Sequence, residues 1–258
     1  MDLKNLGLNN LYNFRDIGGI RTAEGTEVRT GLLYRSDELT KLKRHDIDTL
    51  LHLNIKTVLD LRTVNEVNLR PDDLSDNHQI NVIHIPFTYD QKELGLKRFL
   101  WYLITKSHKF SFSDMIKNYY QAIAFDNTEQ VHQVFEVISE KTNLPALIHC
   151  VSGKDRTGFI TAIIYKLLKV PERLILVDYL RSNKNIKPEL DKFIRYTRWT
   201  KLFQFSPQRV YAMLAQPEYL NFVFREIERR YKSIDQYLVK GCKVEYEQIN
   251  QLKKILLS

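Results

Sequence analysis

The sequence predicts an α/β fold, a sheet core covered by helices, and two observations lead to this prediction. From residue 50 to residue 182, short runs rich in β-branched residues alternate with longer stretches of helical periodicity. A chain of 258 residues, of which 43% are hydrophobic and 27% charged, is long enough to bury a sizeable core. The same composition excludes a disordered, collagen-like or fibrous protein.

Strands are expected at three places in the core of this fold. Residues 55–61 (IKTVLDL), 81–87 (NVIHIPF) and 145–149 (PALIH) are short, apolar and rich in β-branched side chains. Upstream, residues 13–36 are rich in Gly and Arg, which indicates strands and turns.

Helices are expected to cover this sheet. Residues 128–141 place apolar side chains on one helical face, and Asp126 or Thr128 is available as the N-cap. The residues of that face are Val131, Val134, Phe135 and Ile138. Residues 157–168 predict an apolar helix, and Pro171 stands where a following helix would take its first turn.

The rest of the chain is expected to be mainly helical. The aromatic-rich residues 90–125 are interpreted as helices that pack on the core, with a mobile lid over a site as the alternative. After Glu172 the pattern is almost wholly helical, and no linker separates it from the core. We therefore expect one domain over residues 1–258, with a core at about 1–182 and a helical C-terminal extension at about 183–258.

The charge of the chain favours anionic partners. Lys and Arg number 39 against 31 Asp and Glu, a net charge of +8, which suits phosphates, nucleic acid or acidic membrane surfaces. No familiar aromatic and basic motif supports nucleic acid, so we expect no nucleic-acid partner. Residues 1–10 are too polar for a secretory signal, and no apolar run approaches the roughly 18 residues of a membrane span. We expect a cytoplasmic protein, with export by another route as the alternative.

The most informative segment joins the third expected strand to the helix at 157–168. It reads HCVSGKDRTG over residues 149–158. The backbone N–H groups of residues 151–156 and the helix N-terminus would form a cradle for an anion, and Arg156 can hold two oxygens of a phosphate with its planar fork. Gly153 allows a backbone angle that a Cβ would resist.

Cys150 lies where the same positive field favours its thiolate form. A thiolate at the base of a phosphate cradle can attack phosphorus in line and give a phosphocysteine that water hydrolyses. A cysteine at a strand end is more often an inert hydrophobic residue, but the five residues that separate Cys150 from Arg156 favour the nucleophile. Cys242 has no basic loop around it and is expected to be structural. Two cysteines so far apart predict neither a disulfide framework nor a zinc site.

Two other loop types fit this segment poorly. A nucleotide-binding P-loop would need Gly where Ile148 stands and Ser or Thr where Asp155 stands. A protease-like Cys–His pair is disfavoured because His149 and Cys150 are consecutive, and consecutive strand side chains point to opposite faces. His149 is therefore expected to brace the loop through hydrogen bonds.

The segment resembles the loop of the Cys-x5-Arg protein tyrosine phosphatases, in particular a bacterial branch with H-C-x-x-G-K-D-R-T-G that also acts on lipid phosphates. Further blocks match that branch in order and spacing: residues 13–19 (NFRDIGG), 31–36 (GLLYRS) with Leu39, 60–63 (DLRT) with Glu66, and 217–220 (PEYL). The resemblance spans most of the chain. It implies a protein tyrosine phosphatase-like fold whose central sheet is mostly parallel.

The resemblance also implies roles for single residues. Cys150 would be the nucleophile, Arg156 the phosphate-binding arginine, and Thr157 a hydroxyl that steadies the leaving thiolate. Asp155, inside the cradle, would be the proton donor, although many tyrosine phosphatases use an aspartate on a separate loop. Lys154 would add a cation for substrates such as inositol phosphates, with a solvated charge on the loop rim as the alternative. The expected phosphate-binding residues are Val151, Ser152, Gly153, Lys154, Asp155 and Arg156.

Two outlying blocks are expected to support the loop. Arg15 and Asp16 would form ion pairs that hold the N-terminal segment over it. Asp60 ends a strand whose C-terminal tip lies near the cradle if the sheet is parallel. Asp60 is therefore expected in a supporting role.

The sequence thus predicts a cysteine-dependent phosphoric monoester hydrolase, a protein tyrosine phosphatase of broad specificity. Its expected partners are phosphoproteins, with phosphoinositides and peripheral contact with an anionic membrane in addition, and no metal or organic cofactor is expected. The alternatives are an enzyme that acts primarily on phosphoinositides and a phosphoprotein-binding module with little turnover. A silent phosphatase would be expected to lack the loop Cys or Arg, and both are present.

Overall fold

The computed structural model describes residues 8, 10–74, 79–89, 112–200, 211 and 213–258. Its centre is a five-stranded sheet with the order β1-β2-β5-β3-β4. The strands are β1 (Arg15–Asp16), β2 (Leu33–Ser36), β3 (Thr57–Asp60), β4 (Asn81–His84) and β5 (Ala146–His149). β1 is antiparallel to β2, and every other pair in the sheet is parallel. The predicted mostly parallel sheet is confirmed.

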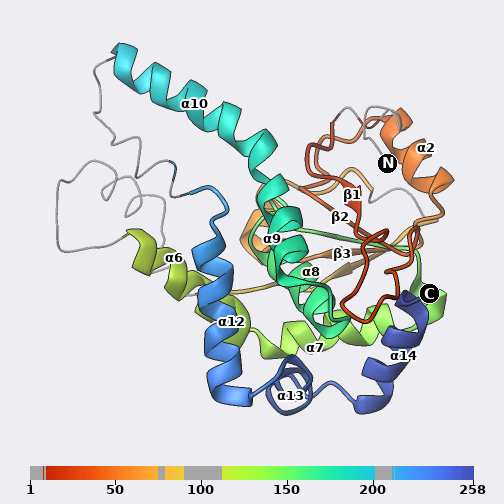
Figure 1. Cartoon of the computed structure of the whole chain (residues 1–258). Coiled ribbons are helices and arrows are strands. Elements are labelled where there is room, and N and C mark those ends of the chain that lie inside the picture. The colour runs from red at the N-terminus through yellow and green to blue at the C-terminus, as the bar shows by residue number, and fades with distance from the viewer. Residues whose placement is uncertain (1–7, 9, 75–78, 90–111, 201–210, 212) are drawn as a thin grey trace.

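Helices cover both faces of this sheet (Figure 1). Those before β5 are α2 (Arg44–His52), α3 (Val64–Leu69), α6 (Phe112–Gln121) and α7 (Thr128–Ser139). After β5 come α8 (Arg156–Leu167), α9 (Glu172–Arg181), α10 (Asn183–Thr200), α12 (Pro217–Tyr231), α13 (Ile234–Gln236) and α14 (Tyr246–Leu256). Short π-helical turns at Ala122–Asp126 and Tyr237–Gly241 and a 3-10 turn at Lys141–Asn143 link some of them.

β2, β3 and β5 are buried on both faces, and their side chains alternate between two hydrophobic clusters, whereas the edge strand β4 is mostly exposed. In β5, Ala146 and Ile148 belong to the larger cluster and Leu147 to the smaller one. In β3, Leu59 faces the larger cluster and Val58 the smaller one. The larger cluster also contains buried residues of α7, α8 and α9, whereas the smaller one includes Leu50 of α2, and Figure 1 shows α2 and α7 on opposite sides of the sheet.

The C-terminal helices share the larger cluster with the core. Leu220 and Val223 of α12 and Leu252 of α14 are fully buried in it. Figure 1 shows α10 extending away from the rest of the chain. Within the described residues, no helix combines the length and the apolar character that crossing a membrane requires.

Several predicted elements differ from the structure in detail. The helix predicted at 128–141 is α7, but its N-cap is Asn127 rather than Asp126 or Thr128, because a π-helical turn runs directly into it. Asn127 does not cap α7 with its side chain, which bonds to Thr88 and to the Ala122 carbonyl instead. Pro171 is the N-cap of α9 and not its first helical residue.

The aromatic-rich segment at 90–125 is described only from residue 112 onward. There α6 packs Tyr120 into the core with no exposed surface, as predicted. The residues that would decide between packed helices and a lid, Phe99, Trp101, Tyr102 and Phe110, lie outside the described residues.

The parallel register brings the C-terminal ends of neighbouring strands together. Ser36 of β2 and Asp60 of β3 both lie opposite His149, the last residue of β5. Ligands of open parallel sheets gather at this edge. Cys150 follows His149 directly, so the fold places the predicted loop at the edge where a site is expected.

Candidate active site

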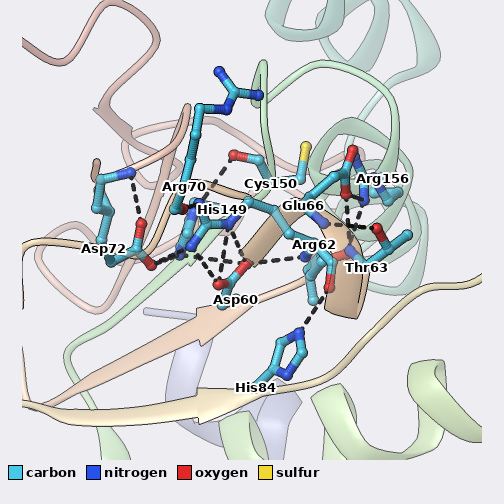
Figure 2. Close-up of polar contacts among 12 residues, drawn as sticks. Asp60, Arg62, Thr63, Glu66, Arg70, Asp72, His84, His149, Cys150 and Arg156 are labelled. Atoms are coloured by element: carbon cyan, nitrogen blue, oxygen red, sulfur yellow. Dashed lines mark hydrogen bonds and ion pairs between the residues drawn. The ribbon is translucent and has the colours of Figure 1, made fainter. Parts of the chain in front are cut away.

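The loop between β5 and α8 consists of Cys150 and residues 151–155. Cys150 is 1% exposed, and Figure 2 shows its sulfur pointing away from the ring of His149. Gly153 has a φ of +64°, and a Cβ at this position would lie 2.3 Å from the Ser36 carbonyl oxygen. The loop therefore requires glycine both for its backbone conformation and for its close approach to β2.

The carbonyl groups of the loop are held from outside. Glu38 N–H donates to the Val151 oxygen at 3.0 Å. The Asn13 side chain donates to the oxygens of Ser152 and Gly153 at 2.9 and 3.0 Å, and the latter also accepts from Arg35 Nη2 at 2.6 Å. Within the described part of the chain, no backbone N–H of residues 151–155 donates to another group. These amides and the N-terminus of α8 leave a set of donors for an anion.

A buried ion-pair network anchors the groups that hold the loop. Asp178 of α9 lies 2.6 Å from Arg15 Nε and 2.6 Å from Arg35 Nη1. Arg15 in turn donates to the backbone and side-chain oxygens of Asn13. Burial raises the pKa of Asp178, but Arg35 and Arg15 outweigh it and hold that pKa below its usual range. Arg15 therefore forms an ion pair that holds the N-terminal segment in place, as expected. Asp16 instead accepts hydrogen bonds from the N–H groups of Gly18 and Gly31.

Arg156 is fixed by Glu66 of α3 (Figure 2). Its Nη1 and Nη2 donate to the two oxygens of Glu66 at 2.6 and 3.0 Å, and Nη1 also donates to the Leu61 oxygen at 3.2 Å. The buried Nε has no partner among the described residues. Each Nη nitrogen carries two hydrogens, and the pairing with Glu66 uses one from each. The Nε hydrogen and the second Nη2 hydrogen lie along another edge of the guanidinium, and this edge suits a phosphate.

A hollow of about 510 Å³ adjoins this ion pair. It is lined by Thr63, Asn65, Glu66, Asn68, Leu69 and Tyr89. Burial raises the pKa of Tyr89, and the charge of Arg156 opposes that rise. The hollow therefore offers space for a substrate next to the candidate phosphate position.

His149 faces away from the loop into a buried polar cluster (Figure 2). Its Nε2 lies 3.3 Å from Asp72 and 3.8 Å from Asp60, and its Nδ1 lies 3.4 Å from the Cys150 oxygen. Asp60, Asp72 and His149 are the kinds of groups that bind a metal. Arg62 lies 2.7 Å from both carboxylates, however, and its guanidinium already supplies the positive charge. Asp60 supports the strand end, without a described contact to the loop amides.

Asp155 and Lys154 lie on the side of the loop that faces α6 and the turn before α12. Asp155 Oδ1 accepts a hydrogen bond from Tyr120 at 2.7 Å and lies 3.4 Å from Lys154 Nζ. Lys154 also donates to the Met213 oxygen. With only 11% of its side chain exposed, Lys154 is not the solvated charge that the alternative described.

Thr157 Oγ1, which was predicted to steady the leaving thiolate, is buried and has no partner among the described residues. Other features of the site were not predicted individually. Asn13, Arg35 and Glu66 appeared in the sequence only within the resembling blocks. Tyr120, Asp178 and Tyr179 carried no recognisable signal, because their partners are distant in the chain.

Comparison with known proteins identifies the family. The model of the family described as "Tyrosine phosphatase family" matches residues 6–258. The chain belongs to the tyrosine phosphatase family. The family predicted from the loop and the four outlying blocks is confirmed, and the chain is a protein tyrosine phosphatase, a hydrolase of phosphate monoesters.

Curated relatives of this phosphatase are bacterial. It is 27% identical over 273 residues to "Triple specificity protein phosphatase PtpB" of Mycobacterium tuberculosis, covering 95% of this chain and 96% of that protein. It is 29% identical over 157 residues to a "Tyrosine-protein phosphatase" of Nostoc commune, covering 61% of this chain and 50% of that protein. A solved structure, the core catalytic domain of the PP-IP phosphatase SIW14 from S. cerevisiae, matches with a TM-score of 0.36 and 17% identity, covering 85% of this chain and 93% of that chain.

Proposed function

We propose that this tyrosine phosphatase works through a phosphocysteine intermediate on Cys150. The observation that carries the proposal is the pairing of a buried cysteine at the end of β5 with an arginine whose Nε edge has no described partner. The unpaired loop amides point to the same ligand, because a phosphate monoester has equatorial oxygens for both the amides and the guanidinium.

The residues divide the chemistry as follows. Arg156 and the amides of residues 151–155 hold the phosphate, and the helix N-terminus favours the Cys150 thiolate. Asp155 gives a proton to the leaving oxygen. Thr157 offers its buried hydroxyl to the thiolate when it leaves phosphorus.

The proposed reaction has two steps that balance. In the first, the thiolate forms the S–P bond, the P–O bond to the leaving group breaks, and the Asp155 proton passes to the leaving oxygen. In the second, water attacks phosphorus, its proton goes to the Asp155 carboxylate, and the S–P bond breaks to release phosphate and the thiolate. Asp155 ends protonated, ready for another turnover.

We further propose broad specificity, covering phosphotyrosine, phosphoserine and phosphothreonine, and phosphoinositides. Two observations support this range. Lys154 brings an ammonium into the loop, where it can meet a second phosphate. A relative that matches almost its full length is named a triple specificity phosphatase. The net charge of +8 would favour approach to phosphoinositides in an anionic membrane.

Trapping the intermediate tests the mechanism. Wild type and Cys150→Ser are mixed with a phosphotyrosine peptide, quenched in acid and analysed by mass spectrometry. We expect a phosphoryl group on Cys150 in wild type, and no turnover but retained phosphate binding in Cys150→Ser, because a hydroxyl is too protonated to attack. Cys242→Ser is the matched control and should keep full activity. Equal turnover by wild type and Cys150→Ser would overturn the covalent mechanism.

The proton donor is tested with leaving groups of different basicity. Asp155→Asn should slow phosphotyrosine hydrolysis by about a hundredfold or more, and should slow a nitrophenyl ester much less. An equal loss on both substrates would show that Asp155 shapes the loop instead.

A panel of phosphopeptides and phosphoinositides, offered with a chelator, tests the proposed specificity. Activity on phosphotyrosine alone would narrow the proposed range of substrates.

A further inference from the structure

A chain of hydrogen bonds leads from a buried tyrosine of α9 to Asp155. Tyr179 of α9 and Tyr120 of α6 share a short hydrogen bond between their hydroxyls. Tyr120 then donates to Asp155 Oδ1 at 2.7 Å. None of the steps proposed above uses either tyrosine.

The chain of hydrogen bonds has one direction. A phenol has a single hydrogen to donate. Because Tyr120 gives its only hydrogen to Asp155, Tyr179 must donate its own hydrogen to Tyr120. Burial, with the charge of Asp155 adding to it, raises the pKa of both phenols well above the usual value, so both keep their hydrogens at neutral pH.

The two oxygens of Asp155 therefore have different surroundings. Oδ1 faces the Tyr120 hydroxyl and the ammonium of Lys154. Among the described residues, no group donates to Oδ2. The turn before α12 holds one partner of Oδ1, since the Met213 oxygen accepts a hydrogen bond from Lys154. Asn183 fixes this turn through hydrogen bonds of 2.8 and 2.7 Å with Ala215.

We propose that Tyr120 and Tyr179 are positioning residues for the proton donor: they keep Asp155 Oδ1 a hydrogen-bond acceptor, so that Oδ2 carries the proton that is transferred. This inference rests on the proposed role of Asp155. When the S–P bond forms and the P–O bond breaks, the Oδ2 proton passes to the leaving oxygen, and the resulting charge on the carboxylate is met by the Tyr120 hydrogen. Neither tyrosine gains or loses a proton.

Other charged or titratable groups also face Asp155. They are Lys154 on the loop, Tyr89 after β4, Tyr119 on α6 and Tyr219 on α12. All of them are unchanged in the variants below. A change in the pH profile of those variants therefore reports on the tyrosine pair.

Tyr120→Phe is the principal test. A donor to a carboxylate favours its ionised form, so without Tyr120 the acid keeps its proton to higher pH. We expect the alkaline limb of the kcat profile on a phosphotyrosine peptide to move up by about one pH unit, and kcat at neutral pH to fall about tenfold, the size of one hydrogen bond. The loss on nitrophenyl phosphate should be much smaller, because that leaving group needs little proton transfer.

Tyr179→Phe tests the order of the chain. Tyr179 acts on Asp155 only through Tyr120, so its variant should show a smaller shift in the same direction. The double variant should match Tyr120→Phe alone, because the second removal has nothing left to act on. A double variant whose pH profile shows the full sum of two independent shifts would overturn the serial arrangement.

Tyr237→Phe is the matched control. It also removes a buried phenol, whose hydroxyl donates to the Ala124 oxygen, and its pH profile should stay that of wild type.

If Tyr120→Phe fails to fold, as judged by circular dichroism, Tyr179→Phe carries the test. Two results with a folded variant would overturn the inference: an unchanged alkaline limb of the kcat profile, or an equal loss of activity on both leaving groups. In that case wild type and Asp155→Asn still behave as proposed. If Asp155→Asn itself shows no leaving-group dependence, the proposed role of Asp155 fails instead.

Discussion

Glu66 and Arg156 meet end to end: the carboxylate oxygens of Glu66 lie 2.6 and 3.0 Å from Nη1 and Nη2 of Arg156 (Figure 2). Burial raises the pKa of Glu66, but the hydrogen bonds and charge of Arg156 outweigh it and hold that pKa below its usual range. The carboxylate is therefore charged at neutral pH and stays paired. This pairing fixes the plane of the guanidinium and leaves its Nε edge as the one that can receive a phosphate.

Glu66→Gln should weaken the enzyme without removing a group that contacts substrate. The amide keeps one acceptor, but its NH2 group faces a guanidinium that can only donate, so Arg156 loses its fixed orientation. We expect kcat/KM for a phosphotyrosine peptide to fall about tenfold, with vanadate inhibition weakened to match. Glu226→Gln, which breaks the exposed pair with Arg229, is the control and should leave the kinetics unchanged. Wild-type vanadate affinity in Glu66→Gln would show that the ion pair does not orient Arg156.

The two cysteines should differ strongly in reactivity. Burial raises the pKa of Cys242 to about 12, so its thiol stays protonated at neutral pH. Cys150, by contrast, lies beside the unpaired loop amides and Arg156. We expect iodoacetate to alkylate Cys150 long before Cys242 at about pH 6.5, and inorganic phosphate to protect Cys150. Mass spectrometry of the labelled peptides measures both rates, and equal rates would contradict an activated Cys150.

Much of the fold could be predicted from the sequence because its signals are local. The runs at 55–61, 81–87 and 145–149 each contain an observed strand, since β-branched residues favour strands in a sheet. The helices at 128–141 and 157–168 followed from apolar periodicity. The helix caps were less predictable, because Asn127 bonds to Thr88 on another segment and not to the helix that it begins.

The loop itself could also be predicted, and its supports could not. Residues 149–158 hold their chemistry in consecutive positions, so spacing alone identifies an anion cradle. Asp178, by contrast, reaches the loop through Arg35, a residue 143 positions away. The pair of Tyr120 and Tyr179 forms across 59 positions. No local pattern records such contacts, since they depend on how α6 and α9 pack against each other in the folded chain.

Gly153→Ala should cost both stability and activity. The φ of +64° disfavours a side chain, and the new Cβ would lie 2.3 Å from the Ser36 oxygen, so the loop must move. Gly25→Ala is the matched control, because its φ of +87° is also positive but its Cβ would meet nothing within 4 Å. We expect Gly25→Ala to lose about 1–2 kcal/mol of unfolding free energy with normal kinetics. Gly153→Ala should lose more, together with most of its turnover. Equal effects of the two changes on activity would show that the close approach to β2 is unimportant.

Lys154→Met should separate substrates by their number of phosphates. The change keeps a long side chain and removes the ammonium that lies 3.4 Å from Asp155. We expect kcat/KM for a phosphoinositide bisphosphate to fall about tenfold more than that for a phosphotyrosine peptide, the loss of one charge-assisted contact. Both assays are run with dispersed lipid and a chelator. Parallel losses on the two substrates would assign Lys154 to the loop alone.

Asp178→Asn should destabilise the protein in a pH-dependent way. The ion pairs with Arg15 and Arg35 hold the pKa of Asp178 below its usual value, so the folded state binds this proton less readily than the unfolded chain. Such a group contributes stability above its unfolded pKa of about 3.9 and loses that contribution as the pH falls through the lower folded value. Removing one partner of a buried pair costs about 3–5 kcal/mol at neutral pH.

The measurement is the unfolding free energy of wild type and Asp178→Asn in urea between pH 7 and pH 3. The difference between the two should be constant down to about pH 5 and shrink below about pH 4, as wild type takes up the proton. Glu24→Gln, which breaks an exposed pair with Lys169, should track wild type throughout. A difference that grows as the pH falls would mean that burial, and not the two arginines, dominates Asp178. Because Arg35 also donates to the Gly153 oxygen, turnover in Asp178→Asn should fall even at pH values where the variant remains folded.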